Sequence, residues 1–151
     1  HLLKPLLERS VVDNSTYATK SELTINLIIP KVLAKAQILV DEHRLHQILA
    51  NLLSNAIKYS PVGGEIQLIV SQVEQNIEIA VKDEGAGIPE HYKSKLFQRF
   101  SQADASSAKE KGGTGLGLAL CKELAEAMNG HIGFDESSSA GATFYVRFPL
   151  H

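Results

Sequence analysis

The chain has 151 residues, of which 44% are hydrophobic and 21% are charged, and its formal net charge at pH 7 is −2. This length and composition fit one globular domain with a core of its own. The slightly acidic balance disfavours a nucleic-acid-binding protein. The single cysteine, Cys121, excludes an internal disulfide framework and suits a reducing compartment. The apolar runs are too short to span a bilayer, so we expect no direct membrane contact.

The first part of the chain predicts short elements followed by a long amphipathic helix. Residues 1–9 predict a short helix, and alternating apolar and polar residues over 23–29 predict a strand. Residues 36–40 predict another short strand. Residues 42–59 repeat apolar side chains at helical spacing, and Asp41 directly before them is a good N-cap.

The middle of the chain predicts a hairpin and then a functional loop. A Pro-Val-Gly-Gly turn at 61–64 precedes two expected strands, over 65–73 and 76–83. A short amphipathic helix is expected over 90–97. Residues 101–112 are polar and small, so we expect a mobile loop there, and long loops inside compact domains are usually functional.

The last third predicts one helix and two closing strands. Residues 116–128 have helical periodicity, with one apolar stripe formed by Leu116, Leu120, Leu124 and Met128. Strands are expected over 131–135 and 142–148. This order of elements predicts an α+β fold, a mixed sheet with helices on one face. We expect a single domain over 1–151, with residues 1–19 as an N-terminal extension or linker.

Three amides recur along the helix predicted over 42–59. Gln47, Asn51 and Asn55 stand at i, i+4 and i+8, so they share one side of it. They are either structural residues bonded to the backbone, since a buried carboxamide needs a partner, or contacts to a polar ligand or metal ion. An amide oxygen suits a Mg²⁺ ion bound to phosphates. Lys58 and Tyr59, one turn further on, fit a phosphate contact and a base contact, or an ordinary surface.

A carboxylate and two glycines follow the second predicted strand of the hairpin. Asp83 continues the parity of the apolar residues of that strand, so its side chain is aimed at the apolar face of the sheet. A carboxylate there only accepts hydrogen bonds, which suits an exocyclic amine such as that of adenine. Gly85 and Gly87 let a flat ring approach the backbone. The alternative is an ordinary Asp/Gly turn.

A glycine-rich segment opens the helix predicted over 116–128. Residues 112–118 read GGTGLGL, and backbone N–H groups at a helix N-terminus attract an anion. The segment is not a P-loop, because no Gly-Lys-Ser/Thr follows, and no strand precedes it as in a dinucleotide-binding fingerprint. A flexible hinge for the loop at 101–112 is the other interpretation, and both can hold.

The order of these motifs resembles that of sensor histidine kinases. NLLSNAIKY, DEGAGIP, FQRF and GGTGLGL are similar to the N, G1, F and G2 boxes of that family, and the resemblance covers about residues 20–150. The final Ser-Ala-Gly-Ala-Thr-Phe at 139–144 resembles its last strand. The fold implied is the Bergerat ATP-binding fold, a two-layer α+β sandwich whose mixed, mainly antiparallel sheet packs on helices. The segments FSQAD at 100–104 and GGTGLGLAL at 112–120 resemble those of hybrid kinases.

The resemblance implies a role for each matching residue. Asn55 would ligate Mg²⁺ and, with Asn51, carry catalysis, and Asp83 would specify adenine with support from Thr143. Residues 89–115 would form the ATP lid, anchored by Phe97 and Phe100. The remaining ATP contacts would be Lys58, Tyr59, Gly85, Gly87, Ile88, Gly113, Thr114, Gly115, Leu116 and Gly117. The chain departs from the family at Gln102, where many members have a basic residue, and in having no histidine with the context of a phospho-acceptor.

The function implied is that of a protein-histidine kinase domain. It would bind Mg-ATP and transfer the γ-phosphoryl group to a histidine on a separate dimerisation domain, with a response regulator downstream. It would work in the cytoplasm, whether or not its parent is membrane-anchored. The alternatives are an ATP hydrolase of the same fold and a nucleotide-binding regulatory module without catalysis. Hydrolases of this fold generally have a glutamate as general base where Asn51 stands, and an amide cannot accept that proton.

Overall fold

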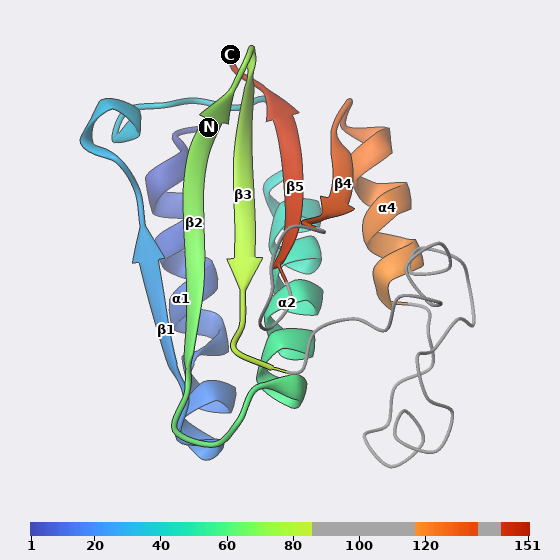
Figure 1. The fold of residues 1–151 in the computed structure, drawn as a ribbon. Coiled ribbons are helices and arrows are strands. Elements are labelled where there is room, and N and C mark those ends of the chain that lie inside the picture. The colour runs from blue at the N-terminus through green and yellow to red at the C-terminus, as the bar shows by residue number, and fades with distance from the viewer. Residues whose placement is uncertain (86–116, 136–142) are drawn as a thin grey trace.

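One five-stranded sheet organises the domain in the computed structural model, which describes residues 1–85, 117–135 and 143–151. The strand order is β1-β2-β3-β5-β4, with β1 parallel to β2 and the other neighbouring pairs antiparallel (Figure 1). The predicted mixed, mainly antiparallel sheet is therefore confirmed. The strands are β1 Thr24–Ile28, β2 Glu65–Val73, β3 Asn76–Lys82, β4 His131–Phe134 and β5 Thr143–Pro149.

The helices form a second layer on one side of this sheet. They are α1 Leu3–Lys20, α2 Glu42–Tyr59 and α4 Gly117–Ala127, with a short 3-10 helix over Lys31–Leu33. In Figure 1, α1 and α2 lie behind the strands and α4 lies beside β4. The core fills the space between the layers with apolar side chains of both, among them Leu7, Leu45, Leu49, Leu53, Ile66, Leu68, Ile77, Ile79, Val146 and Phe148.

The long central helix begins and ends where its sequence predicts. Oδ1 of Asp41 accepts a hydrogen bond from the backbone N–H of Arg44 at 3.1 Å, which satisfies one of the donors that a helix N-terminus leaves unpaired. Leucine, isoleucine and alanine side chains at helical spacing make one face fully buried. Burial of that face fixes the helix against the sheet and α1.

The β2–β3 hairpin also follows the predicted pattern. Ile66, Leu68 and Val70 are fully buried on one face of β2, and Ile77 and Ile79 continue that face in β3. Their neighbours in β2 point to the opposite face and are half-buried or exposed. The turn before β2 contains Gly63 at a φ of +84°, a conformation that favours glycine.

The first helix is longer than the helix predicted over residues 1–9. It runs from Leu3 to Lys20, and two of its buried residues are polar, Ser10 and Asn14. The Ser10 hydroxyl is 2.6 Å from Nδ1 of His46 on α2, and the Asn14 amide donates to the carbonyl oxygen of Ser10 at 2.8 Å. These partners make burial of the polar groups acceptable, whereas the sequence pattern shows only an interrupted apolar stripe.

The strand predicted over 36–40 does not form as such. The segment makes two isolated bridges, between Leu2 and Gln37 and between Ile38 and Leu150. Each end of the chain forms one bridge with this segment, so the segment does not form a continuous row of strand hydrogen bonds with either end.

The apolar stripe predicted for the helix at 116–128 is also partly wrong. Leu120 is 37% exposed, whereas the buried residues of α4 are Ala119, Cys121 and Ala125. Small side chains let α4 pack closely on α2, so they occupy the interface although they are less hydrophobic than leucine. The prediction ranks side chains by hydrophobicity, so it assigns the leucines to the buried face of this helix.

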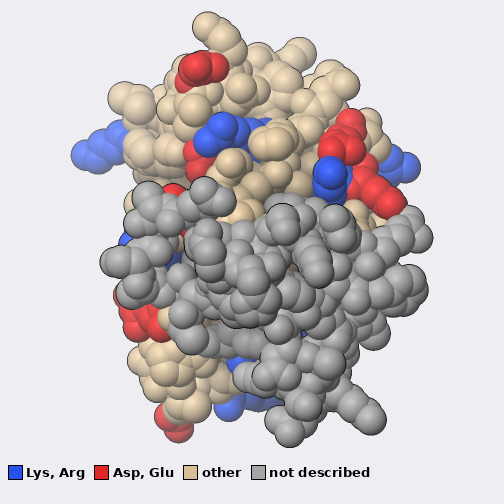
Figure 2. Space-filling model, turned by 45° about the vertical axis from the view of Figure 1, so that its right-hand side comes forward, with Lys and Arg blue, Asp and Glu red and all other residues tan. Residues whose placement is uncertain are grey.

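Charged side chains are spread over the surface of the domain. On the face shown in Figure 2, Lys and Arg side chains lie among Asp and Glu side chains over the described part, as the small net charge leads one to expect. Among the described residues, no helix combines the length and the apolar character that crossing a membrane requires.

Candidate functional site

The topology gathers several predicted site residues at one end of the domain. The turn at 61–64 leads from the end of α2 into β2, so these two ends lie together. β3 runs antiparallel to β2 and pairs Lys82 with Gln67, which returns the chain to the same end just before Asp83. A Cβ built on Gly64 would lie 3.3 Å from Oε2 of Glu84, which confirms that the turn and the end of β3 are adjacent. In Figure 1, α2 ends near this turn and the end of β3, and the first turn of α4 lies to the right of α2.

The amides Asn51 and Asn55 lie at the edge of the buried face of α2. Both are half-buried, while Gln47 and Lys58 are exposed. This arrangement follows from the helical repeat, which places Asn51 and Asn55 beside the buried positions and turns Gln47 and Lys58 further away from them. The side chains of Asn51 and Asn55 are therefore positioned by a helix that the core holds, without being enclosed in that core. Tyr59 ends the helix, and its side chain lies outside the described residues.

Asp83 is a buried carboxylate at the end of β3. Its exposed fraction is 6%, so the parity argument that aimed it at the apolar face is confirmed. One carboxylate oxygen, Oδ1, accepts a hydrogen bond from the backbone N–H of Gly85 at 2.8 Å. This bond closes a local turn and fixes the orientation of the carboxylate. A carboxylate with a fixed orientation suits recognition of an amine, because it accepts hydrogen bonds and donates none.

The first turn of α4 lies against Asn51. A Cβ built on Gly117 would lie 3.6 Å from Oδ1 of Asn51, an ordinary packing distance. One turn later the Cys121 thiol is fully buried, and it donates to the carbonyl oxygen of Ile48 over 3.8 Å. The structure thus places the N-terminus of α4, where backbone N–H groups favour anions, beside an amide of α2.

Thr143 is not positioned as the sequence predicts. It pairs with Lys82 in the register of β3 and β5, and it shares its side of β5 with Tyr145. The side chain of Asp83 lies on the opposite side of the sheet, the side on which Ile77, Ile79 and Val81 are buried. The alternation of side chains therefore points Thr143 away from the face of Asp83, and the register does not support the predicted contact between them.

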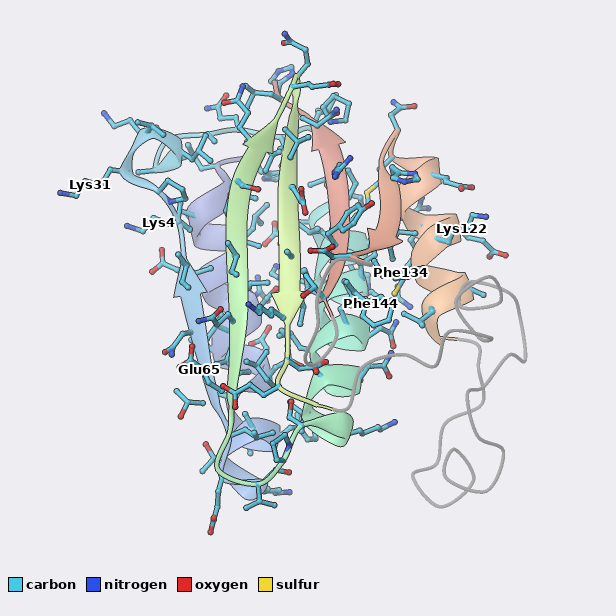
Figure 3. The ribbon with its side chains drawn as sticks, viewed as in Figure 1. Lys4, Lys31, Glu65, Lys122, Phe134 and Phe144 are labelled. Carbon is cyan, nitrogen blue, oxygen red and sulfur yellow. The ribbon has the colours of Figure 1, made fainter. Side chains whose placement is uncertain are left out.

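Two aromatic rings at this end of the sheet were not among the predicted site residues. Phe134 of β4 and Phe144 of β5 have ring centroids 6.4 Å apart and an angle of 53° between the rings (Figure 3). Phe144 pairs with Val81, two residues before Asp83, and packs against the core. The pair therefore places apolar surface beside Val81, in the strand that ends just before Asp83. Sequence spacing alone could not indicate it, because β4 and β5 pair across residues 136–142.

Cys121 is a further residue beside this site that was not among the predicted site residues. Burial raises the pKa of its thiol to about 12, while a hydrogen bond with the Asn51 side chain acts in the opposite direction. The thiol is therefore protonated at neutral pH and serves as a small hydrogen-bonding group between α2 and α4.

Several predicted site residues lie outside the described residues. They belong to the lid expected over 89–115, including the helix expected over 90–97, and to the segments that flank it. They are Gly87, Ile88, Phe97, Phe100, Gln102, Gly113, Thr114, Gly115 and Leu116.

A comparison with protein families matches this arrangement of elements over most of the chain. Residues 40–151 match the profile described as histidine kinase-, DNA gyrase B- and HSP90-like ATPase. The chain belongs to this ATPase family. The match includes the whole of α2, the end of β3 and all of α4, so every described residue of the candidate site falls within the family's ATP-binding domain.

The relatives of this family domain include histidine kinases from several bacteria. The signal transduction histidine-protein kinase BarA of Escherichia coli K12 is 38% identical over 146 residues, which cover 93% of this chain and 16% of BarA. The circadian input-output histidine kinase CikA of Synechococcus elongatus is 46% identical over 109 residues, 72% of this chain and 14% of CikA. The chain thus spans less than a fifth of the length of these relatives.

Solved histidine kinase structures have the same fold as this ATPase domain. Full-length ShkA in complex with AMPPNP superposes with a TM-score of 0.79 at 29% identity, covering 99% of this chain and 31% of ShkA. The nucleotide-free catalytic domain of the histidine kinase ThkA gives a TM-score of 0.81 at 24% identity, covering 99% of this chain and 93% of that domain. The predicted two-layer α+β architecture is confirmed by this agreement.

Proposed function

We propose that this domain binds Mg-ATP and transfers the γ-phosphoryl group to a histidine on a separate dimerisation domain of a two-component sensor kinase. The observation that carries the proposal is the buried Asp83 carboxylate at the same end of the domain as the amides of α2 and the N-terminus of α4. An acceptor for a base, oxygen ligands for a metal and N–H donors for phosphate are the groups that an ATP site needs. Histidine kinases among the relatives support the choice of reaction.

The adenine end of the proposed site rests on Asp83. Its carboxylate is oriented by the Gly85 N–H, and Gly85 has no side chain to obstruct a flat ring. In a desolvated position, a hydrogen bond from the adenine amine to this carboxylate contributes more than it would in water. The rings of Phe134 and Phe144 supply apolar surface nearby.

The metal end rests on Asn55. Mg²⁺ keeps several waters and binds phosphate oxygens together with only one or two protein oxygens, so a single amide side chain can serve as its protein ligand. Asn55 is half-buried, and its carboxamide oxygen is a hard, neutral ligand. When bound, Mg²⁺ neutralises phosphate charge.

The protein residues act mainly by positioning. Phosphoryl transfer depends on alignment and on stabilising charge, so a rigid α2 and the N–H groups of α4 can orient the phosphates without a covalent step on this chain. The nucleophile is the acceptor histidine of the other domain. The amide of Asn51 cannot take a proton from water, which favours transfer to a partner over hydrolysis and separates this proposal from a Bergerat-fold hydrolase.

The decisive experiment supplies γ-labelled ATP and Mg²⁺ with the histidine-bearing dimerisation domain of the parent kinase. We expect an acid-labile phosphohistidine on the added domain only, and almost none with Asn55→Ala. Ser54→Ala is the matched control, because Ser54 neighbours Asn55 and its hydroxyl donates to the backbone of Asn51 at 3.2 Å. Full transfer by Asn55→Ala would contradict the metal assignment. Rapid phosphate release without any labelled histidine would favour the hydrolase, and ATP binding with neither product would favour the regulatory module.

A further inference from the structure

A tight turn over residues 128–130 closes the end of α4. The backbone N–H of Gly130 donates to the carbonyl oxygen of Ala125 at 2.8 Å, and the N–H of Asn129 donates to that of Glu126 at 3.1 Å. Asn129 has a φ of +61°, which lies in the left-handed region. These two hydrogen bonds and the left-handed residue form the Schellman motif, a common way for a helix to end.

The structure restricts the residue type at both positions of this turn. The left-handed conformation at position 129 favours glycine or asparagine over other residues. A Cβ built on Gly130 would lie 2.6 Å from the Phe148 ring and 2.8 Å from the carbonyl oxygen of Arg147, so only glycine fits there. Asn129 is exposed to water, and it begins the single Asn-Gly pair in the sequence.

An Asn-Gly pair is chemically labile, because glycine has no Cβ to hinder attack of its backbone nitrogen on the asparagine side chain. In this reaction the nitrogen of Gly130 forms a bond to Cγ of Asn129, the bond from Cγ to Nδ2 breaks, and ammonia leaves with the proton of the Gly130 N–H. Water then opens the succinimide ring at either carbonyl and gives aspartate or isoaspartate. The net reaction consumes one water, releases one ammonia and adds one negative charge.

We propose that Asn129 is a site of spontaneous deamidation and that the turn at the end of α4 controls its rate. In the folded chain, the hydrogen bond to the carbonyl oxygen of Ala125 engages the N–H of Gly130, whose nitrogen must make the attack. The reaction therefore requires the turn to open, and opening of a helix end costs less free energy than global unfolding. The inference is independent of the proposed function, because the reaction needs no nucleotide.

The products of deamidation do not fit this turn. Isoaspartate lengthens the main chain by one carbon directly before Gly130, which has no room on the side of Phe148. Either product also places a carboxylate at the C-terminal end of α4, where the carbonyl oxygens of the helix already make the potential negative. Deamidation should therefore weaken the junction between α4 and β4 and lower the midpoint of thermal unfolding by about 3 °C or more.

Peptide mapping by mass spectrometry after incubation in mildly alkaline buffer tests the site. The samples are the folded chain, the chain unfolded in urea, and an unstructured peptide with the sequence of residues 124–134. The peptide and the unfolded chain should react at Asn129 at similar rates, and the folded chain about tenfold more slowly or less. Asn26 is the internal control, because it is also exposed but is followed by Leu27, whose side chain hinders the attack.

Equal rates at Asn129 in the folded chain and the peptide would overturn control by the turn, and no reaction in urea would overturn the site itself. Asn129→Gly is the matched variant, because glycine adopts the left-handed conformation and has no side-chain amide. This variant should unfold close to fresh wild type and stay unchanged on incubation, whereas incubated wild type should unfold at a lower temperature. Equal losses of thermal stability in both proteins on incubation would contradict the proposed effect of deamidation.

Discussion

The two faces of α2 differ in what they contribute. Its leucine face is at most 2% exposed at Leu45, Leu49, Leu52 and Leu53, and it closes the core against the sheet and α1. Its amide face has half-buried Asn51 and Asn55 and exposed Gln47, and at Asn51 it adjoins the first turn of α4. One side of this helix thus packs in the core, and the other carries the amide side chains of the candidate site. Stability and ligand binding should be separable by mutation within these 18 residues.

The difference also concerns how each face is held. Apolar packing on the leucine face is spread over many contacts, so its energy is large and insensitive to ligand. The amide face is held by few and specific contacts with α4, such as that of the Cys121 thiol with the carbonyl oxygen of Ile48 and that of Gly117 with Asn51. Loss of one partner there should change the geometry of the site more than the free energy of unfolding.

The largest effect on stability is expected from Leu53→Ala. Leu53 is completely buried, so its truncation leaves a cavity between α2 and the sheet and should lower the free energy of unfolding by about 2–5 kcal/mol. Urea denaturation measures the loss. Gln47→Ala on the same helix should stay within about 0.5 kcal/mol of wild type. Similar losses from both variants would mean that the two faces do not differ in the way described.

An intermediate effect, on binding instead of stability, is expected from Asp83→Asn. The substitution replaces one acceptor oxygen of a buried group with a donor, so ATP affinity should fall by about 1–3 kcal/mol, or about 5–150-fold. Calorimetry with an ATP analogue gives the value. Glu84→Gln is the adjacent control, because Glu84 is exposed and should change affinity little. Unchanged affinity in Asp83→Asn would remove the adenine assignment.

The smallest effect is expected from Asp41→Ala at the start of α2. Loss of the hydrogen bond to the Arg44 N–H should cost about 1 kcal/mol of stability. ATP affinity should be unchanged, because the cap is at the N-terminal end of α2, whereas Asn51 and Asn55 lie in its second half. Asp41→Asn, which keeps a capping oxygen, should stay close to wild type in thermal unfolding. A drop in affinity without a drop in stability would show that the two ends of α2 are more tightly coupled than its packing suggests.

Local sequence patterns were sufficient to predict the features that depend on a single helix, strand or hairpin. The boundaries of α2, its Asp41 cap, the β2–β3 hairpin and the burial of Asp83 follow from periodicity and parity, because each depends on side chains a few residues apart. The order of the four motifs was likewise visible in the chain, and the family match agrees with it.

Tertiary structure decided the features that depend on a distant partner. The burial of Ser10 on α1 depends on His46, whose Nδ1 lies 2.6 Å from the Ser10 hydroxyl, and the buried face of α4 depends on how closely small residues approach α2. The register of β3 with β5 turned Thr143 away from Asp83. Hydrophobicity along a sequence predicts which residues prefer burial, but the partner that satisfies a polar group, or the spacing that admits a small one, exists only once separate elements have packed together.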